Sequence, residues 1–383
     1  MKVYLDNAAT TRVAQEVVEA IEPFNSQKYG NASSLHSFGQ DAKEALENAR
    51  KLLAKRINAE PDEIVFTSGG SEANNLAIRG MAQINGFGHI ITSKIEHPAV
   101  LQTCKDLEKQ GFEVTYVGVD AQGRVDLKSL ESSIKDHTFL VSIMHVNNEV
   151  GVIQNIAEIG KVCSDRKVVF HTDAVQSFTK IPIDVKNMNI GLASFSAHKL
   201  HGQKGIGMLY VRKGIKLKNQ ITGGEQEFKI RAGTENVAGV VGFAKASEIL
   251  TQEDITRMSN LKKHLRQELL NISDTKINGP DDGLCNILNV SFRYIEGESI
   301  LLRLDAEGVA VSTGSACSSA NLAPSHVLIA MGLEHEAAHG SIRFSLSKYT
   351  TKEEINYTVK CARTVVIELR KISPLTPRGD KNV

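Results

Sequence analysis

Strand-like and helix-like stretches alternate through the first two-thirds of this sequence. Apolar and β-branched runs with the length of buried strands occur at 64–68, 89–93, 113–119, 139–146, 168–174, 193–197 and 205–212. Helical patterns lie before and between them, near 40–57, 97–109, 127–135 and 155–165. Because parallel strands need a long crossover, usually a helix, this alternation predicts an α/β fold with a mainly parallel, seven-stranded sheet flanked by helices. Only a loop separates the last two runs, so part of the sheet is expected to be antiparallel.

The character of the sequence changes near residue 240. A long polar helix is expected at 255–271 and a final amphipathic helix at 351–372, which Pro374 ends. Strands are expected between them at 286–292, 309–313 and 341–347, and a helix at 298–307. We therefore predict a large α/β domain over residues 1–245 and a smaller α+β domain over residues 246–383, with residues 1–15 packing on the smaller domain.

Charge and hydropathy exclude several classes of partner. Lys and Arg number 45 against 44 Asp and Glu, so the net charge is +1 and argues against nucleic acid or an acidic membrane as the main partner. No apolar run reaches membrane-spanning length, and the first residues lack the apolar core of a signal peptide. A cytoplasmic protein is expected. The five cysteines show no CxxC spacing, so neither a disulfide framework nor a compact metal site is predicted.

Polar side chains follow several of the predicted strands. Gly70 and Ser71 stand after the first strand at the start of a helix, where free N–H groups and the helix dipole favour an anion. Other strands are followed by His97, Asn148, Asp173 and Lys199. Each residue alone also fits an ordinary role, such as a helix cap, an Asx turn or a solvated side chain. Together they favour pyridoxal phosphate, which needs a lysine for a Schiff base, a carboxylate at its ring nitrogen and an anion site for its phosphate.

A run of small polar residues at 312–320 surrounds Cys317. Such a run cannot contribute to a core, so a surface loop is expected. An accessible thiol in that setting is a candidate nucleophile or metal ligand, although an incidental exposed thiol fits the same pattern.

With these residues placed, the chain resembles the cysteine desulfurases of the IscS/NifS type, which are fold-type-I pyridoxal phosphate enzymes. The resemblance runs almost end to end, because the segments that carry it occur in family order: YLDNAATT at 4–11, TSGGSEANN at 67–75, EHPAV at 96–100, HVNNEVG at 145–151, HTDAVQ at 171–176, SFSAHK at 194–199, RAGTEN at 231–236, GSACSS at 314–319 and SIRFSL at 341–346.

The resemblance implies a role for each matching residue. Lys199 would form the Schiff base, Asp173 would pair with the pyridine nitrogen, and His97 would stack on the ring and move protons. Further contacts to the cofactor are implied for Gly70, Ser71, Asn148, Gln176, Ser196 and His198, with Thr234 reaching in from the second subunit of a homodimer.

The same resemblance implies the chemistry of the substrate. Asn148 and Arg343 would receive the carboxylate of L-cysteine, and Arg suits that task because its fork binds carboxylates bidentately. Cys317 would be the nucleophile that takes the sulfur as a persulfide and leaves alanine. The sulfur would then pass to a scaffold protein, similar to IscU, for iron–sulfur cluster assembly.

Two alternatives stay open. One is a selenocysteine lyase on the same fold. The other is a partner-dependent assembly component in which Cys317 is one ligand of a [2Fe–2S] cluster shared with the scaffold, since thiolates are the usual cluster ligands.

The chain also departs from the family pattern before RAGT, where a third glycine and a basic residue are usual. Glu225 and Phe228 stand in this stretch, and an acid there is expected to weaken cofactor binding. The tail after Pro374 is shorter than the scaffold-docking tail of housekeeping bacterial members.

Overall fold

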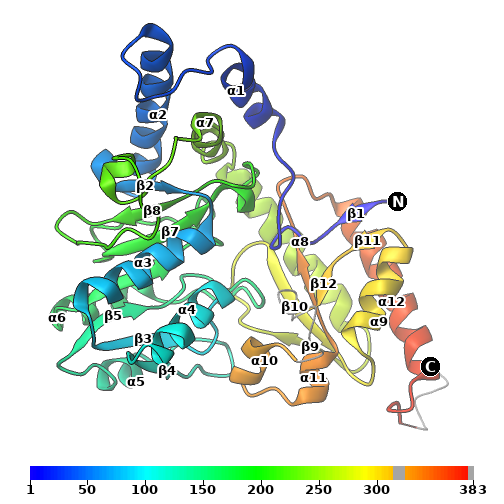
Figure 1. Ribbon diagram of the computed structural model, residues 1–383. Coiled ribbons are helices and arrows are strands. Elements are labelled where there is room, and N and C mark those ends of the chain that lie inside the picture. The colour runs from blue at the N-terminus through cyan, green and yellow to red at the C-terminus, as the bar shows by residue number, and fades with distance from the viewer. Residues whose placement is uncertain (314–323, 378–383) are drawn as a thin grey trace.

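A seven-stranded sheet forms the centre of the first two-thirds of the chain (Figure 1). The computed structural model describes residues 1–313 and 324–377. The strands of this sheet are β2 (Ile64–Thr67), β3 (His89–Ser93), β4 (Glu113–Val117), β5 (Thr138–Ser142), β6 (Val169–Asp173), β7 (Leu192–Ser196) and β8 (Gly207–Val211), in the order β2-β8-β7-β6-β5-β3-β4. β8 pairs antiparallel with both neighbours, and the other pairings are parallel. The carboxyl ends of β2, β3, β5, β6 and β7 therefore meet at one edge, which confirms the predicted fold class.

Helices cover both faces of this sheet because side chains alternate along each strand. Ile90 packs with α3 (Gly70–Asn85) and α4 (Pro98–Lys109) on one face. Its neighbour Ile91 belongs to the core on the opposite face. That face is covered by α1 (Gln15–Ser26), α2 (Ser37–Arg56), α5 (Leu127–Ser132), α6 (Ile156–Asp165) and α7 (Val237–Ala246).

A smaller antiparallel sheet follows in the last third. Its strands are β9 (Thr275–Asn278), β10 (Ile287–Phe292), β12 (Ser312–Thr313) and β13 (Ser341–Ser345), in the order β12-β13-β10-β9. The helices α8 (Gln252–Leu270), α9 (Gly297–Ala306) and α12 (Lys352–Ile372) share a core with it. Two short helices, α10 (His326–Ala330) and α11 (His335–His339), complete this part.

The N-terminus joins this second part of the molecule. β1 (Val3–Tyr4) pairs in parallel with β11 (Val309–Ala310), and Asp6 forms a bridge with Ser345 of β13. The single strand predicted at 309–313 is therefore two short strands: β11 pairs with the N-terminus, whereas β12 pairs with β13. Residues 3–6 run beside the second sheet and lead the chain from there to α1 (Figure 1).

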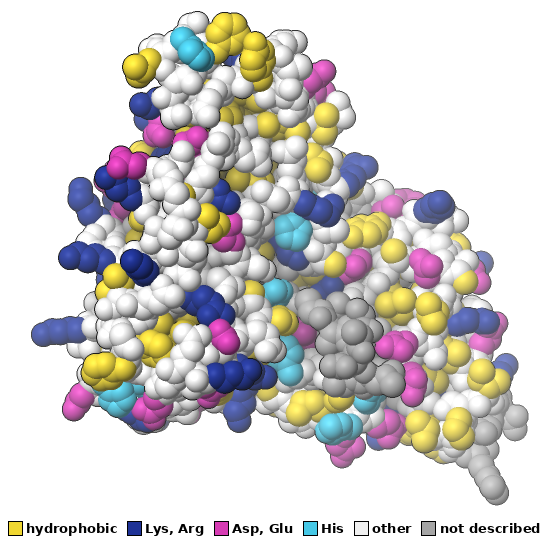
Figure 2. All heavy atoms as spheres, viewed as in Figure 1, with side chains coloured by type: hydrophobic (Ala, Val, Ile, Leu, Met, Phe, Trp, Pro, Cys, Tyr) yellow, Lys and Arg dark blue, Asp and Glu magenta, His cyan; other side chains and the backbone are white. Residues whose placement is uncertain are grey.

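Charges of both signs are interspersed over the face shown in Figure 2. Hydrophobic side chains gather at the top of this view, over the end where α1 and α2 meet (Figures 1 and 2). Among the described residues, no helix has both the length and the apolar character needed to cross a bilayer.

Candidate active site

One cavity of about 310 Å³ lies where the strand ends meet. Residues that follow β2, β3, β5, β6 and β7 line it, together with parts of the N-terminal segment and of β13. The predicted site residues along its wall are Gly70, Ser71, His97, Asn148, Asp173, Gln176, Ser196, His198, Lys199 and Arg343. The fold thus brings ten predicted residues together from separate parts of the sequence.

The N-terminus of α3 opens into this cavity. Its first residues, Gly70 and Ser71, carry N–H groups without partners inside the helix. A Cβ added at Gly70 would lie 2.8 Å from Cγ2 of Val175, so a larger residue there would push Val175 aside and narrow the cavity. Ser196 and His198, from the end of β7 and the short helix after it, line the same cavity. This arrangement suits a phosphate group.

Asp173, the last residue of β6, is held by two donors. Its Oδ1 accepts the backbone N–H of Val175 at 3.0 Å, and its Oδ2 accepts the side-chain amide of Asn74 at 2.7 Å. Asn74 is 1% exposed, lines the cavity, and its own Oδ1 has no protein partner. The sequence alone does not point to Asn74, because an asparagine inside a helical pattern gives no signal of a site.

Lys199 reaches the N-terminal segment. Its Nζ donates to the carbonyl oxygens of Ala8 and Ala9 at 2.7 and 2.6 Å. Its own carbonyl accepts from Nζ of Lys180 at 3.2 Å, and Lys180 also donates to the carbonyl of Gln176 at 3.1 Å. Burial lowers the pKa of Lys180 to about 8. A second, half-buried lysine therefore holds the backbone of two predicted site residues.

His97 caps α4, and this contact fixes its tautomer. Nδ1 of His97 accepts the backbone N–H of Ala99 at 3.1 Å. A ring nitrogen that accepts a hydrogen bond carries no proton, so the neutral ring holds its proton on Nε2. Burial lowers the pKa of His97 and favours this neutral form.

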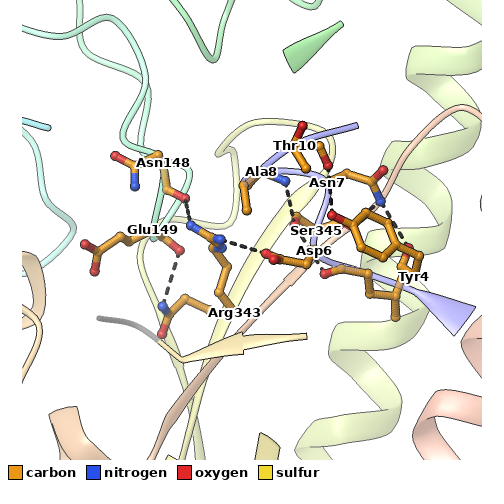
Figure 3. A network of polar contacts seen from close by, with 12 residues as sticks. Tyr4, Asp6, Asn7, Ala8, Thr10, Asn148, Glu149, Arg343 and Ser345 are labelled. Atoms are coloured by element: carbon orange, nitrogen blue, oxygen red, sulfur yellow. Dashed lines mark hydrogen bonds and ion pairs between the residues drawn. The ribbon is translucent and has the colours of Figure 1, made fainter. Parts of the chain in front are cut away.

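Arg343 lies between the N-terminal segment and the loop after β5 (Figure 3). One Nη donates to Oδ1 of Asp6 and the other to the carbonyl of Asn148, at 2.8 and 3.0 Å. Its Nε is buried and has no protein partner. The guanidinium is therefore fixed in orientation while it still has an unused donor, and Asp6 offsets part of its charge.

Two predicted residues do not lie along this cavity. Thr234 is exposed, on a segment outside the cavity wall. Cys317 lies outside the described residues. Among the described cysteines, Cys104 and Cys163 are buried, and burial raises the pKa of both thiols to about 12, so they are poor nucleophiles.

The segment before Thr234 adopts a constrained turn. Glu227, Phe228 and Lys229 all have positive φ, which is unfavourable for residues other than glycine. Glu227 pairs with the buried guanidinium of Arg50 at 2.8 Å and accepts the N–H of Phe66 at 2.7 Å. Cζ of the Arg50 guanidinium lies over the ring of Phe228, 5.1 Å from the ring centroid.

Glu225 in the same segment is 79% exposed and pairs with Lys229 at 2.9 Å. It is not part of the cavity wall. Its expected effect on cofactor affinity stays a prediction.

The donor set fits pyridoxal phosphate. An amine, a buried carboxylate with its own donors and a helix N-terminus share one cavity, and a Cβ at Gly70 would collide with its wall. Among the described residues, no group of three His, Cys, Asp or Glu side chains could hold a metal ion.

Comparison with known proteins agrees with this geometry. The sequence profile of the aminotransferase class-V family matches residues 3–358. "Cysteine desulfurase IscS" of Dictyoglomus turgidum is 52% identical over 97% of this chain and 96% of its own length. The protein of the same name from Methanosarcina thermophila is 50% identical, over 98% and 95%.

Solved structures give the same relationship. A structure described as a NifS-like protein has a TM-score of 0.91 at 41% identity, over 96% of this chain and all of the other. A structure described as SspA in complex with cysteine has a TM-score of 0.83 at 40% identity, over 91% and 100%. The chain therefore belongs to the aminotransferase class-V family, among its pyridoxal-phosphate-dependent cysteine desulfurases.

Proposed function

We propose that this protein removes sulfur from L-cysteine, leaves L-alanine, and carries the sulfur as a persulfide on Cys317. The observation that carries the proposal is that one cavity holds Lys199, Asp173 and Arg343 beside the N-terminus of α3. These groups match the needs of an amine-linked cofactor, its ring nitrogen, its phosphate and a substrate carboxylate.

The cofactor, when bound, withdraws electrons from the substrate. Lys199 would hold it covalently through Nζ, and Asp173, supported by Asn74, would keep a proton on its ring nitrogen. Gln176 would contact its phenolic oxygen, and its phosphate would bind Gly70, Ser71, Ser196 and His198. His97 would cover the ring and supply a proton from Nε2, the nitrogen that its cap leaves available.

The carboxylate of L-cysteine would bind at Arg343 and Asn148. Arg343 is 2% exposed and its Nε has no protein partner, so an incoming carboxylate would satisfy a buried donor. The contacts of Arg343 with Asp6 and with the Asn148 carbonyl set its orientation.

The sulfur step balances without an external oxidant. The Cys317 thiolate attacks the sulfur of the substrate, an S–S bond forms and the C–S bond breaks. The electron pair of the broken bond stays with the substrate carbon, which takes a proton in place of sulfur. L-cysteine and the Cys317 thiol thus give L-alanine and the Cys317 persulfide.

The assembly around this chemistry is also part of the proposal. A homodimer would cover the exposed Tyr29, Leu35 and Phe38 near the α1–α2 end and bring Thr234 to the second site. A scaffold protein similar to IscU would accept the sulfur in the cytoplasm, and Cys317 would be a ligand of a [2Fe–2S] cluster only in complex with it. The division into domains at residues 245 and 246 belongs to the same set of proposals.

Alanine formed from L-cysteine tests the core of the proposal. The protein loaded with pyridoxal phosphate is incubated with L-cysteine and a thiol reductant, beside a Cys317→Ala variant that binds the cofactor equally well. We expect repeated turnovers for the first and no turnover for the second. Equal alanine from both proteins would disprove the role of Cys317, and selenocysteine turned over far faster than cysteine would favour the lyase alternative.

A further inference from the structure

The short helix α10 packs on the loops at the edge of the large sheet, although it follows the second sheet in the sequence. Val327 and Leu328 are buried together with Ile95, Met144 and Val150, which come from the segments after β3 and β5. In Figure 1, α10 lies where the two parts of the molecule meet. The start of α10 is thus placed next to the candidate active site.

Ser325, the residue before α10, makes two hydrogen bonds with its hydroxyl group. Its Oγ accepts the backbone N–H of Leu328 at 3.2 Å and donates to the carboxyl group of Glu149. Ser325 is 2% exposed and Glu149 is 6% exposed. Burial raises the pKa of the Glu149 carboxyl to about 7. The helix cap of α10 is therefore linked to a buried acid of the loop after β5.

His326 makes a parallel contact to the loop after β3. Its Nε2 lies 3.0 Å from the backbone carbonyl oxygen of Glu96. A carbonyl oxygen can only accept, so Nε2 of His326 carries the proton and donates it. Two consecutive residues thus bind two different loops of the large sheet.

The two loops are joined to each other and carry predicted site residues. The side-chain amide of Asn147 donates to the carbonyl of Ile95 at 2.8 Å, and its Oδ1 accepts the N–H of Glu149 at 2.9 Å. Glu96 immediately precedes His97, and Glu149 immediately follows Asn148. Ser325 and His326 are therefore fixed relative to residues that line the cavity.

In the sequence, Cys317 lies between Thr313 and Ser325. Before it, β12 pairs with β13, and Ser312 lies opposite Arg343 in that pairing. After it, Ser325 and His326 bind the loops described above. The described residues on both sides of Cys317 are thus attached at the predicted substrate site.

We propose that Ser325 and His326 are positioning residues for sulfur transfer, because they attach the chain at residues 325 and 326, beyond Cys317, to the loops holding His97 and Asn148. The proposal rests on the proposed function, because it needs Cys317 as the sulfur acceptor. Neither residue lines the cavity, so we expect replacement of Ser325 or His326 to leave cofactor and substrate binding unchanged. Misplacing a reacting group by about 1 Å can lower a rate 100-fold.

Replacement of Ser325 by Ala tests this role in the protein loaded with pyridoxal phosphate. We expect kcat for alanine formation to fall at least tenfold. The L-cysteine concentration that half-saturates the change in cofactor absorbance should stay within twofold of wild type. Ser325→Thr keeps the hydroxyl and should restore most of the rate. The rate at which iodoacetamide alkylates Cys317, read by mass spectrometry, should change in Ser325→Ala and not in Ser325→Thr.

Glu149 offers a second test that does not remove the helix cap. Glu149→Gln keeps an acceptor for Ser325 and should retain kcat within about threefold of wild type. Glu149→Leu removes the acceptor and should lower kcat as much as Ser325→Ala does. Thr351→Ala is the matched control, because it removes the cap of the remote helix α12, where Thr351 Oγ1 accepts the N–H of Glu354 at 3.2 Å. It should leave kcat unchanged.

The outcomes separate this proposal from the one on which it rests. Wild-type kcat in both Ser325→Ala and Glu149→Leu would overturn the positioning role alone. Loss of kcat together with weaker cysteine binding would also overturn it, because that pattern reports general damage to the cavity. Wild-type protein that forms no Cys317-dependent alanine would overturn the proposed function and, with it, this proposal.

Discussion

Asn74 donates its side-chain amide to Oδ2 of Asp173 at 2.7 Å, and both residues are buried. Hydrogen bonds to charged groups contribute about 1.5–3 kcal/mol, so this contact supports the carboxylate that the cofactor ring requires. Asn74 therefore prepares the site before any ligand binds.

Replacing Asn74 with Leu should weaken cofactor binding by roughly tenfold or more, because Asp173 loses a donor in a buried place. Titration of the cofactor-free protein with pyridoxal phosphate, followed by absorbance, measures this directly. Asn85→Leu is the control on the same helix, where the amide donates only to the backbone of Met81. Equal affinities for the Asn74 variant and wild type would refute the supporting role.

Much of the site could be predicted because the ends of the strands can be recognised in the sequence. The strands that precede His97 and Asp173 are short apolar runs, and parallel strands bring their carboxyl ends to one edge. The residues after them could thus be expected to meet without knowledge of contacts. The cavity wall matches that expectation for Lys199 as well.

The contributions of distant segments could not be predicted. The carbonyl oxygens of Ala8 and Ala9 accept hydrogen bonds from Lys199, which follows them by 191 and 190 residues in the sequence. No local sequence pattern encodes a contact over that separation. The helix α1 was missed for a local reason: Ala14 precedes it without a side-chain cap, and Pro23 lies inside it. α7 was missed because it is apolar and rich in glycine, without an amphipathic stripe.

Asp6 should tune the affinity for substrate through Arg343. Its carboxylate lies 2.8 Å from the guanidinium and offsets the charge that would attract a substrate carboxylate. Asp6→Asn keeps an acceptor of the same shape and removes the negative charge. We expect the KM for L-cysteine to fall about threefold, with cofactor affinity unchanged. A rise in KM would show instead that the charge of Asp6 is needed to orient Arg343.

Glu96 should make the stability of the protein depend on pH. It is fully buried, and burial raises the pKa of its carboxyl from 4.5 to about 8. Between these values the folded state binds more protons than the unfolded state, so stability falls as pH rises from about 5 to 8. Glu96→Gln keeps an acceptor for Ser93 and Met144 but cannot titrate.

The midpoint of urea unfolding, measured for both proteins at pH 5.5, 7 and 8.5, tests this expectation. Between pH 5.5 and 8.5 the free energy of unfolding of Glu96→Gln should rise by roughly 3 kcal/mol relative to that of wild type, on top of a constant offset. Glu131→Gln, at a half-exposed surface site, should show the same pH dependence of the free energy of unfolding as wild type. If the free energies of unfolding of wild type and Glu96→Gln changed with pH in parallel, the Glu96 carboxyl of the folded wild type would be ionised throughout this range.

His97 combines a structural task and a proposed chemical task that two substitutions separate. Its Nδ1 caps α4 at Ala99, while its ring lines the cavity. His97→Asn keeps a good capping group and loses the ring, so thermal stability of the cofactor-free protein should stay near wild type while cofactor affinity falls. His97→Phe keeps a ring and loses the cap, at a cost of about 1 kcal/mol in stability. Both variants lack the Nε2 proton, so alanine formation should fall at least 100-fold in each. Activity retained in His97→Phe would assign the ring a stacking role alone.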